Sequence, residues 1–330
     1  MSQRSPSSFA QAGYRAPAWL PGGNLQTLWA VALPRPRLDY RRERWTLPDG
    51  DFLDLDWVDG AADAPLLVLF HGLEGSSASH YARFLMAGAR GRGWRGVVVH
   101  FRGCGGEANR LARAYHAGDT GEVDVVLRRL RAGDAATRLL VAGVSLGGNA
   151  LLKWLGEQGE AACGVIDGAA AISAPLDLPA AGAALDRGFN RIYAARFLRT
   201  LKRKSFAKLD RFPGFWDRSA LAAVRTLRGF DDLVTAPLHG FRDAEDYWHK
   251  SASKPWLTAI RVPTLVLNAR NDPFLPAAAL PGREAVSDWV TLDFPAQGGH
   301  VGFVSGPFPG NYWWLPGRVL NFLADASGRC

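Results

Sequence analysis

The stretch from Leu139 to Asn149 holds the residues with the clearest chemical potential. An apolar run ends at Gly143, Ser145 follows after one residue, and Gly147 comes two residues later. This pattern is typical of a nucleophile elbow, in which a strand turns sharply into a helix and exposes a serine hydroxyl at a strained apex. The glycines are needed because a side chain two residues before or after the serine would collide where the two backbones meet. We therefore predict that Ser145 is a nucleophile.

A serine nucleophile needs an imidazole to accept its proton and a carboxylate to orient that imidazole. After Ser145 the sequence supplies Asp272, before a proline, and His300, after two glycines. Asp-Pro is also a common turn former, but both residues follow apolar runs that predict neighbouring strands, so their loops can converge on the serine. We predict that Asp272 is the acid and His300 the base. Asp177, which follows another predicted strand, is the alternative acid.

The tetrahedral intermediate of acyl transfer carries an oxyanion that requires two preset donors. We expect these to be the backbone N–H groups of Leu146, directly after the nucleophile, and of Leu73, in the glycine-rich loop at 71–75. His71 is expected to brace this loop, and Glu74 either to hold it or to face water. Arg102, in the next glycine-rich loop, is expected to be a structural ion-pair partner in preference to a substrate ligand.

The segments around these residues predict the elements that position them. Continuous apolar runs indicate strands covered on both faces at 66–70, 96–101, 139–144, 165–172, 262–268 and 289–294, and helical patterns recur near 81–92, 123–130, 151–155 and 315–323. Residues 40–47 and 52–58 flank Pro48-Asp49-Gly50 and predict an antiparallel hairpin. This alternation predicts an α/β fold with a mostly parallel, doubly wound sheet and a ligand crevice at the carboxyl ends of its strands.

The 330 residues suit one large domain with an insertion. We expect a flexible N-terminal segment over 1–16, because it is polar and rich in Ser and Pro, and a single domain over 17–330. Residues from about 177 to 256 contain no obvious buried strand and are predicted to form a helical cap over the crevice.

Within the cap, apolar side chains at helical spacing accompany many basic ones. The apolar set is Phe189, Ile192, Tyr193, Phe197 and Leu201, and the basic set is Arg187, Arg191, Arg196, Arg199, Lys202, Arg203, Lys204, Lys208 and Arg211. The simpler interpretation is a solvated basic face over a packed stripe. The alternative is peripheral membrane contact, in which the basic face meets anionic lipid while the aromatic side chains line an acyl pocket.

Composition and charge exclude several other classes. The formal net charge is +8, yet no nucleic-acid-binding signature accompanies it, so we expect no nucleic-acid partner. The three cysteines and seven histidines lack the spacing of a metal site, and no phosphate-binding glycine loop is present, so we expect neither metal nor cofactor. The first residues lack the apolar core of a signal peptide, and no run of about 18 apolar residues exists. We therefore expect a cytoplasmic protein; its oligomeric state is left open.

Several motifs together are more specific than the elbow. They are Leu25-Gln26-Thr27-Leu28, His71-Gly72-Leu73-Glu74-Gly75-Ser76, His100-Phe101-Arg102-Gly103-Cys104, Ser145-Leu146-Gly147-Gly148-Asn149, Phe230-Asp231-Asp232, Asp272-Pro273-Phe274 and Gly299-His300-Val301-Gly302-Phe303. With these motifs the sequence resembles the YheT-type branch of the α/β-hydrolases, which is related to plant embryogenesis-associated and animal abhydrolase-domain proteins. Asn24 stands where this branch is expected to carry a histidine, and Gly106 where a serine is more usual.

The resemblance runs from about Pro17 to the last helix and implies an α/β-hydrolase fold with hydrolase activity. It implies Ser145 as nucleophile, Asp272 as acid and His300 as base, and related animal proteins act on lipid esters. The sequence thus predicts a cofactor-free serine hydrolase of carboxylic esters with short- to medium-chain acyl groups or lipid character. A thioesterase or acyltransferase with the same triad, or a binding protein that kept the fold without turnover, are the alternatives.

Overall fold

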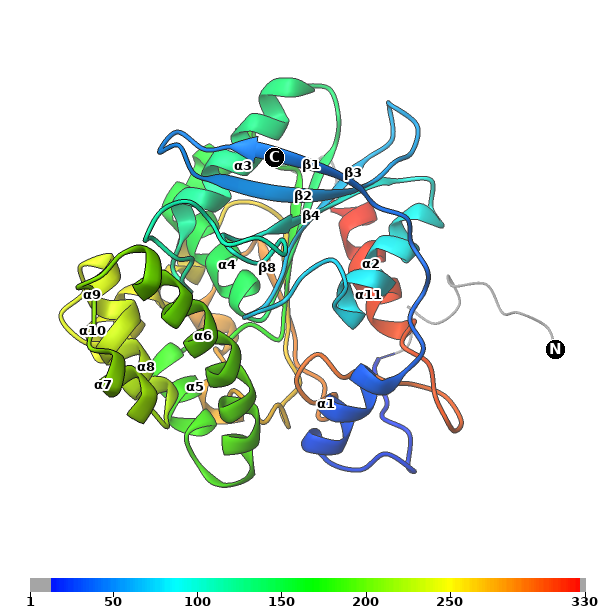
Figure 1. The fold of residues 1–330 in the computed structure, drawn as a ribbon. Coiled ribbons are helices and arrows are strands. Elements are labelled where there is room, and N and C mark those ends of the chain that lie inside the picture. Colours follow the sequence, from blue (N-terminus) through cyan, green and yellow to red (C-terminus); the bar gives the residue numbers. More distant parts are fainter. Residues whose placement is uncertain (1–12, 327–330) are drawn as a thin grey trace.

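The computed structural model describes residues 13–326, and its centre is an eight-stranded sheet with the order β1-β2-β4-β3-β5-β6-β7-β8 (Figure 1). The strands are β1 (Arg41–Thr46), β2 (Phe52–Val58), β3 (Leu66–Phe70), β4 (Arg95–His100), β5 (Leu139–Val144), β6 (Gly168–Ile172), β7 (Thr264–Leu267) and β8 (Val290–Asp293). Strand β2 pairs antiparallel with β1 and β4, and every other pairing is parallel. The predicted hairpin and doubly wound sheet are confirmed.

Helices cover both faces of this sheet. Successive side chains of each strand point to opposite faces, so each strand packs against helices on both sides. Val68 and Val141 pack with helices α3 (Thr120–Gly133) and α4 (Leu146–Gln158) on one face. Leu67 and Leu69 pack with α2 (His80–Arg90) and α11 (Trp314–Asp325) on the other. The strands are therefore buried on both sides, which explains their continuous apolar runs.

The segment between β6 and β7 forms a group of helices beside the carboxyl ends of the strands (Figure 1). These are α5 (Leu178–Leu185), α6 (Arg191–Arg211), α7 (Arg218–Ala223), α8 (Leu227–Phe230), α9 (Ala236–His239) and α10 (Ala244–Ser251), with a π-helical turn at Asp231–Thr235. A separate cluster of buried side chains, which includes Leu198, Leu221 and Phe230, holds part of this group together. We call the segment from α5 to α10 the cap.

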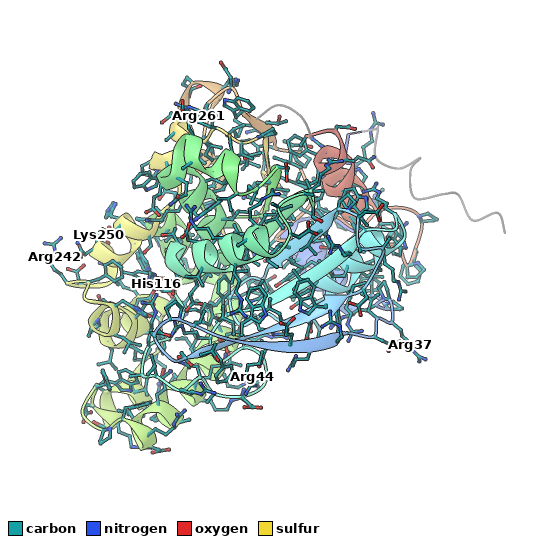
Figure 2. The ribbon with its side chains drawn as sticks, turned by 90° about the horizontal axis from the view of Figure 1, so that it is seen from above. Arg37, Arg44, His116, Arg242, Lys250 and Arg261 are labelled. Atoms are coloured by element: carbon teal, nitrogen blue, oxygen red, sulfur yellow. The ribbon has the colours of Figure 1, made fainter. Side chains whose placement is uncertain are left out.

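Some basic side chains of the cap face solvent, and others form hydrogen bonds with the main domain. The Lys204 ammonium donates to Glu74 Oε1 over 2.7 Å, and the Lys208 ammonium donates to Asn109 Oδ1 over 2.8 Å. Burial lowers the pKa of Lys208 to about 8. Arg242 and Lys250, by contrast, project from the edge of the molecule (Figure 2). The predicted basic face is thus only partly solvated, since Lys204 and Lys208 join the cap to the loops below it.

The described chain is packed against the domain from its first residues. The Tyr14 hydroxyl donates to the carbonyl of Val304 over 2.7 Å, and its ring contacts Phe303 and Trp314. Residues 1–12 of the expected flexible segment lie outside the described residues, and the packing of Tyr14 places ordered chain before Pro17. Among helices within residues 13–326, none combines the length and the apolar character needed to cross a bilayer.

Arg102 joins the hairpin to α3 in the interior. Its guanidinium donates to Asp49 Oδ2 over 2.7 Å, to Asp51 Oδ2 over 3.0 Å and to the Glu122 carboxylate. Arg102, Asp51 and Glu122 are all buried. Arg102 therefore holds the structural ion-pair role expected for it.

Replacing Arg102 tests this buried network. Arg102→Met leaves the Asp51 and Glu122 carboxylates without their cation, so we expect the free energy of unfolding to fall by about 3–5 kcal/mol. The matched control is Arg41→Met, because Arg41 and its partner Asp59 are exposed and their pair contributes at most about 1 kcal/mol. Urea titration at neutral pH measures both variants. If the free energy of unfolding falls by a similarly small amount in both variants, the network does not stabilise the fold.

Candidate active site

Ser145 occupies the sharp turn between β5 and α4. Its backbone has φ 53° and ψ −120°, a conformation rarely adopted by residues with side chains. A Cβ atom on Gly143 would lie 2.5 Å from the Gly147 carbonyl oxygen, and one on Gly147 would lie 2.5 Å from that of Phe70. Both glycines are therefore required by the close approach of β5, α4 and β3, as the sequence pattern predicts.

The structure brings Ser145, His300 and Asp272 together in one chain of hydrogen bonds. His300 Nε2 lies 3.0 Å from Ser145 Oγ, and His300 Nδ1 lies 2.9 Å from Asp272 Oδ2. Because a carboxylate only accepts, Nδ1 carries the proton and Nε2 is free to accept the serine proton. The distances fit a nucleophile, a base and an orienting acid in contact.

The surroundings of Asp272 and His300 fix both side chains. Asp272 Oδ1 accepts from the Phe274 N–H over 2.7 Å, and the Phe274 ring stacks on the imidazole with centroids 3.9 Å apart. Asp177, the alternative acid, instead accepts from Ala180 N–H at the start of α5 and forms an ion pair with Lys254. The geometry thus favours Asp272 over Asp177 as the partner of His300.

The two candidate oxyanion donors lie beside the serine. Leu146 is the first residue of α4, where backbone N–H groups have no acceptor within the helix. Leu73 lies in the loop after β3, and in the described part of the chain neither N–H group has a recorded hydrogen-bond acceptor. Both Leu73 and Ser145 line the same cavity. These amides remain our candidates for the oxyanion hole.

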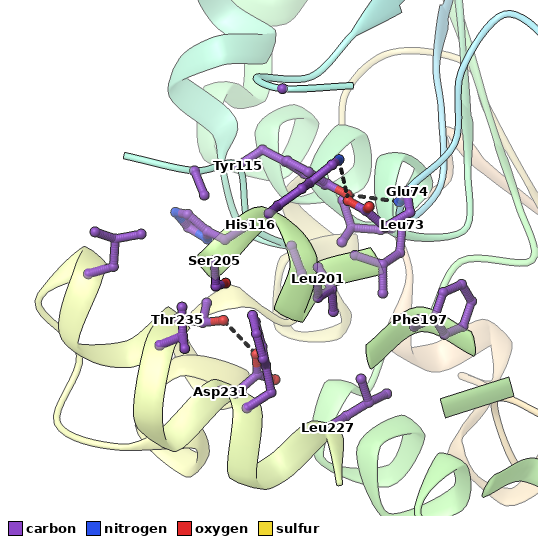
Figure 3. A pocket seen from close by; sticks show the side chains of 18 of the residues that line it. Leu73, Glu74, Tyr115, His116, Phe197, Leu201, Ser205, Leu227, Asp231 and Thr235 are labelled. Atoms are coloured by element: carbon purple, nitrogen blue, oxygen red, sulfur yellow. Dashed lines mark hydrogen bonds and ion pairs between the residues drawn. The ribbon is translucent and has the colours of Figure 1, made fainter. Parts of the chain in front are cut away.

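Glu74 and His71 hold the Leu73 loop from both sides. Glu74 has φ 55°, its N–H donates to the Tyr115 hydroxyl over 2.8 Å, and that hydroxyl donates to Glu74 Oε1 over 2.9 Å (Figure 3). His71 is fully buried; Nε2 accepts from Phe101 N–H, and Nδ1 donates to the Gly72 carbonyl. Burial lowers the pKa of His71 to about 3, so the ring stays neutral and braces the loop.

Two residues of α1 (Gly23–Ala32) connect the acid and histidine loops, and sequence reasoning assigned them no role. Thr27 Oγ1 accepts from the His300 N–H over 2.8 Å. Gln26 Oε1 accepts from Asn271 Nδ2 over 3.0 Å and from the Gly298 N–H over 2.9 Å. Gln26 is fully buried. The motif Leu25-Gln26-Thr27-Leu28 was the available signal, but nothing in it indicated these distant partners.

A cavity of about 630 Å³ extends from Ser145 and His300 beneath the cap. Leu73, Phe197 and Leu201 are among the apolar side chains that line it (Figure 3). Asp231 and Thr235 lie on the side of the cavity away from Leu73 and Glu74 (Figure 3), and the Thr235 hydroxyl donates to the Asp231 carboxylate over 2.7 Å. Burial raises the pKa of Asp231 to about 6. The cavity can thus take an apolar chain, with Glu74 and Lys204 as polar groups beside Leu73 and with Asp231 and Thr235 on the opposite side.

Comparison with known proteins places this geometry in a family. A family model described as alpha/beta hydrolase fold matches residues 65–307. The chain belongs to the alpha/beta hydrolase family. This hydrolase is 40% identical over 300 residues to "Putative esterase YheT" of Escherichia coli, covering 87% of this chain and 88% of that protein. It is 30% identical over 285 residues to "Phospholipase ABHD3" of Mus musculus, covering 83% and 69% of the two chains.

A solved structure agrees with the fold of this alpha/beta hydrolase. The esterase PF2001 of Pyrococcus furiosus superposes with a TM-score of 0.58 at 18% identity, covering 89% of this chain and 97% of that one. The expected α/β-hydrolase fold and the resemblance to the YheT-type branch are confirmed. The names of these two relatives describe an esterase and a phospholipase.

Removing the Thr27 hydroxyl tests whether α1 positions His300. Thr27→Val leaves the His300 N–H without its acceptor, so the imidazole shifts, and we expect kcat on a soluble p-nitrophenyl ester to fall about 10- to 100-fold with KM little changed. Thr27→Ser keeps the acceptor and should restore kcat.

The matched control is Thr258→Val, because Thr258 is exposed in the 3-10 turn Lys254–Ala259. Steady-state kinetics measure all three variants. An unchanged kcat in Thr27→Val, or a failure of Thr27→Ser to restore it, would contradict the positioning role.

Proposed function

We propose that this alpha/beta hydrolase is a serine hydrolase that cleaves carboxylic esters through Ser145, His300 and Asp272. The observation that carries the proposal is the continuous hydrogen-bond chain from Ser145 Oγ through the imidazole to Asp272 Oδ2, with links of 3.0 and 2.9 Å. Family membership supports the same reaction class.

In the proposed mechanism, His300 Nε2 accepts the Ser145 proton as Oγ bonds to the ester carbonyl carbon. The resulting oxyanion receives hydrogen bonds from the Leu73 and Leu146 N–H groups. The intermediate then breaks its bond to the alcohol, which leaves with the proton from His300. Water, activated by the same imidazole, releases the acid from the acyl-enzyme. Throughout, the Asp272 carboxylate stabilises the imidazolium.

The cavity supports an ester with an apolar acyl chain as substrate. Its apolar side chains suit a short- to medium-chain acyl group or a lipid ester, and Asp231 with Thr235 suits a hydrogen-bonding part of the same molecule. A lipid ester is presented at a membrane surface, so peripheral membrane contact near the basic cap belongs to the same proposal.

Removing the nucleophile tests the reaction. Because Ser145 forms the acyl-enzyme, Ser145→Ala should lower kcat on p-nitrophenyl esters by about 10⁴-fold or more while the fold persists. Initial rates across acyl lengths measure the loss, and the optimum length reports the size of the cavity. A fluorophosphonate probe should label the natural protein and not the variant. Turnover that survives in Ser145→Ala would exclude the mechanism, and a natural protein that neither turns over nor labels would indicate a binding role.

Exchanging the carboxylates tests the acid. Asp272→Asn removes the charge that stabilises the imidazolium and should lower kcat about 10⁴-fold. Asp177→Asn is the matched control, because Asp177 caps α5 and should leave kcat within about 3-fold of the natural protein. Circular dichroism checks the fold of both. Near-normal activity in Asp272→Asn, with loss in Asp177→Asn, would reverse the assignment.

A further inference from the structure

Large apolar side chains at the surface are concentrated on one side of the molecule. Among residues 13–326, the exposed large hydrophobic side chains are those of Leu25 (53%), Leu28 (43%), Phe189 (51%), Ile192 (59%), Phe215 (46%) and Phe308 (70%). All except Phe215 belong to three neighbouring elements: α1, the start of α6 with the turn that leads into it, and the loop before α11. Single exposed apolar residues are ordinary, but a contiguous patch marks a contact surface.

Direct contacts show that these three elements adjoin one another. The Tyr193 hydroxyl, at the start of α6, donates to Asn24 Oδ1 in α1 over 3.1 Å, and the Phe189 ring lies 6.0 Å from that of Tyr193. Figure 1 shows α1 and the turn between α5 and α6 on the same lower side of the molecule. Asn24 therefore joins α1 to the cap at the position where the family pattern leads us to expect a histidine.

Two tryptophans join α1 to the Phe308 loop. The rings of Trp19 and Trp29 lie 5.4 and 5.8 Å from the Phe308 ring. Their indole N–H groups donate to the carbonyls of Gly306 and Pro309 in the same loop. Tryptophan is enriched at the boundary between lipid and water, where an apolar ring and a polar N–H are both accommodated. We call the five exposed residues together with these two tryptophans the apolar patch.

Unpaired positive charge borders the apolar patch. Arg187, Arg191, Arg196 and Arg199 are exposed beside Phe189 and Ile192 or on the next turns of α6. Within the described residues, none of the four takes part in an ion pair. The nearest acidic side chain along the chain, Asp186, accepts from the Leu227 N–H. Each arginine near an anionic bilayer contributes about 1 kcal/mol of attraction, so this border favours negatively charged lipid.

The apolar patch is also close to the catalytic histidine. Tyr193 packs against Phe274 with ring centroids 4.9 Å apart, and Phe274 stacks on His300. Phe197, one turn further along α6, lines the cavity and contacts Phe274 as well. A lipid held at the patch would therefore lie near the apolar wall of the cavity.

We propose that the apolar patch docks the enzyme on an anionic lipid bilayer, with Leu28, Ile192 and Phe308 inserted among the headgroups and acyl chains. The arginines of α6 contact the lipid phosphates, and Ser145 receives its substrate from that surface. The role of docking in substrate supply rests on the proposed ester hydrolysis, but vesicle binding itself requires no turnover. The docking surface is thus centred on α1, the start of α6 and the Phe308 loop, and the rest of the basic cap has no part in it.

Cosedimentation with vesicles tests the docking. The full chain carrying Ser145→Ala is mixed with vesicles of phosphatidylcholine alone or with about 30% phosphatidylglycerol, which supplies the negative surface. We expect binding to the anionic vesicles that weakens as salt is raised. Adding Leu28→Ser, Ile192→Ser and Phe308→Ser together should weaken it about 10-fold or more, because three inserted apolar groups are lost.

A matched control distinguishes vesicle binding by the apolar patch from nonspecific hydrophobic binding. Phe215→Ser removes the exposed apolar side chain beyond the far end of α6, about 30 Å along the 21-residue helix, and should leave binding unchanged. Arg187→Glu with Arg191→Glu should weaken binding to anionic vesicles only. If the triple variant does not fold, Ile192→Glu and Phe308→Glu, made singly, should each weaken binding.

Three results would overturn the proposal. One is the absence of binding to either vesicle, and another is binding that the triple variant leaves intact. The third is a dimer in sedimentation velocity that the triple variant converts to a monomer, since a second copy would then cover the patch. Hydrolysis of a soluble short-chain p-nitrophenyl ester by the triple variant with Ser145 restored tests catalysis separately. If this variant still hydrolyses the soluble ester but no longer binds vesicles, ester hydrolysis is supported and the apolar patch is the docking surface.

Discussion

Strands β3 and β5 and helix α4 meet so closely at Ser145 that no side chain fits at Gly143 or Gly147. This contact holds Ser145 in a left-handed conformation that an isolated chain would rarely adopt. The cost is offset by the packing of α4, which lies buried against both the sheet and α3. The same turn directs the hydroxyl toward the His300 loop and leaves the first N–H of α4 without an intrahelical acceptor. The candidate nucleophile and one candidate oxyanion donor are thus placed by a single steric constraint.

Around this turn, the loops of the site are held mainly by neutral hydrogen bonds. Tyr115 holds the Leu73 loop, Ser173 Oγ accepts from the Val301 N–H, and Thr27 accepts from the His300 N–H. Neutral partners leave the Asp272 carboxylate as the charge nearest the imidazole. The exception is the Leu73 loop, where Glu74 also pairs with Lys204 of the cap, while the ion pairs of Arg102 join the hairpin to α3.

Sequence reasoning succeeded where the signal is local. The glycines at 143 and 147 are separated from Ser145 by one residue each, and the apolar runs directly reflect burial on both faces of the sheet. It was less accurate at β6, expected from Val165 but beginning at Gly168, because Val165 and Ile166 are buried in the connection instead of pairing. Phe189 and Ile192 have the spacing of a packed stripe yet are exposed. Roles of Gln26 and Thr27 could not be predicted, because their partners lie more than 240 residues away.

Hydrogen bonds join α1 to the loops that carry Asn271 and His300, and these bonds can form only late in synthesis. Gln26 and Thr27 leave the ribosome early, but Asn271 and His300 emerge only after most of the chain has been made. Contacts with such separations form last, since the intervening chain must first be ordered. Until His300 has been made, Ser145 has no imidazole beside it. The Ser145 hydroxyl can therefore meet the imidazole only after all eight strands and the whole cap have been synthesised.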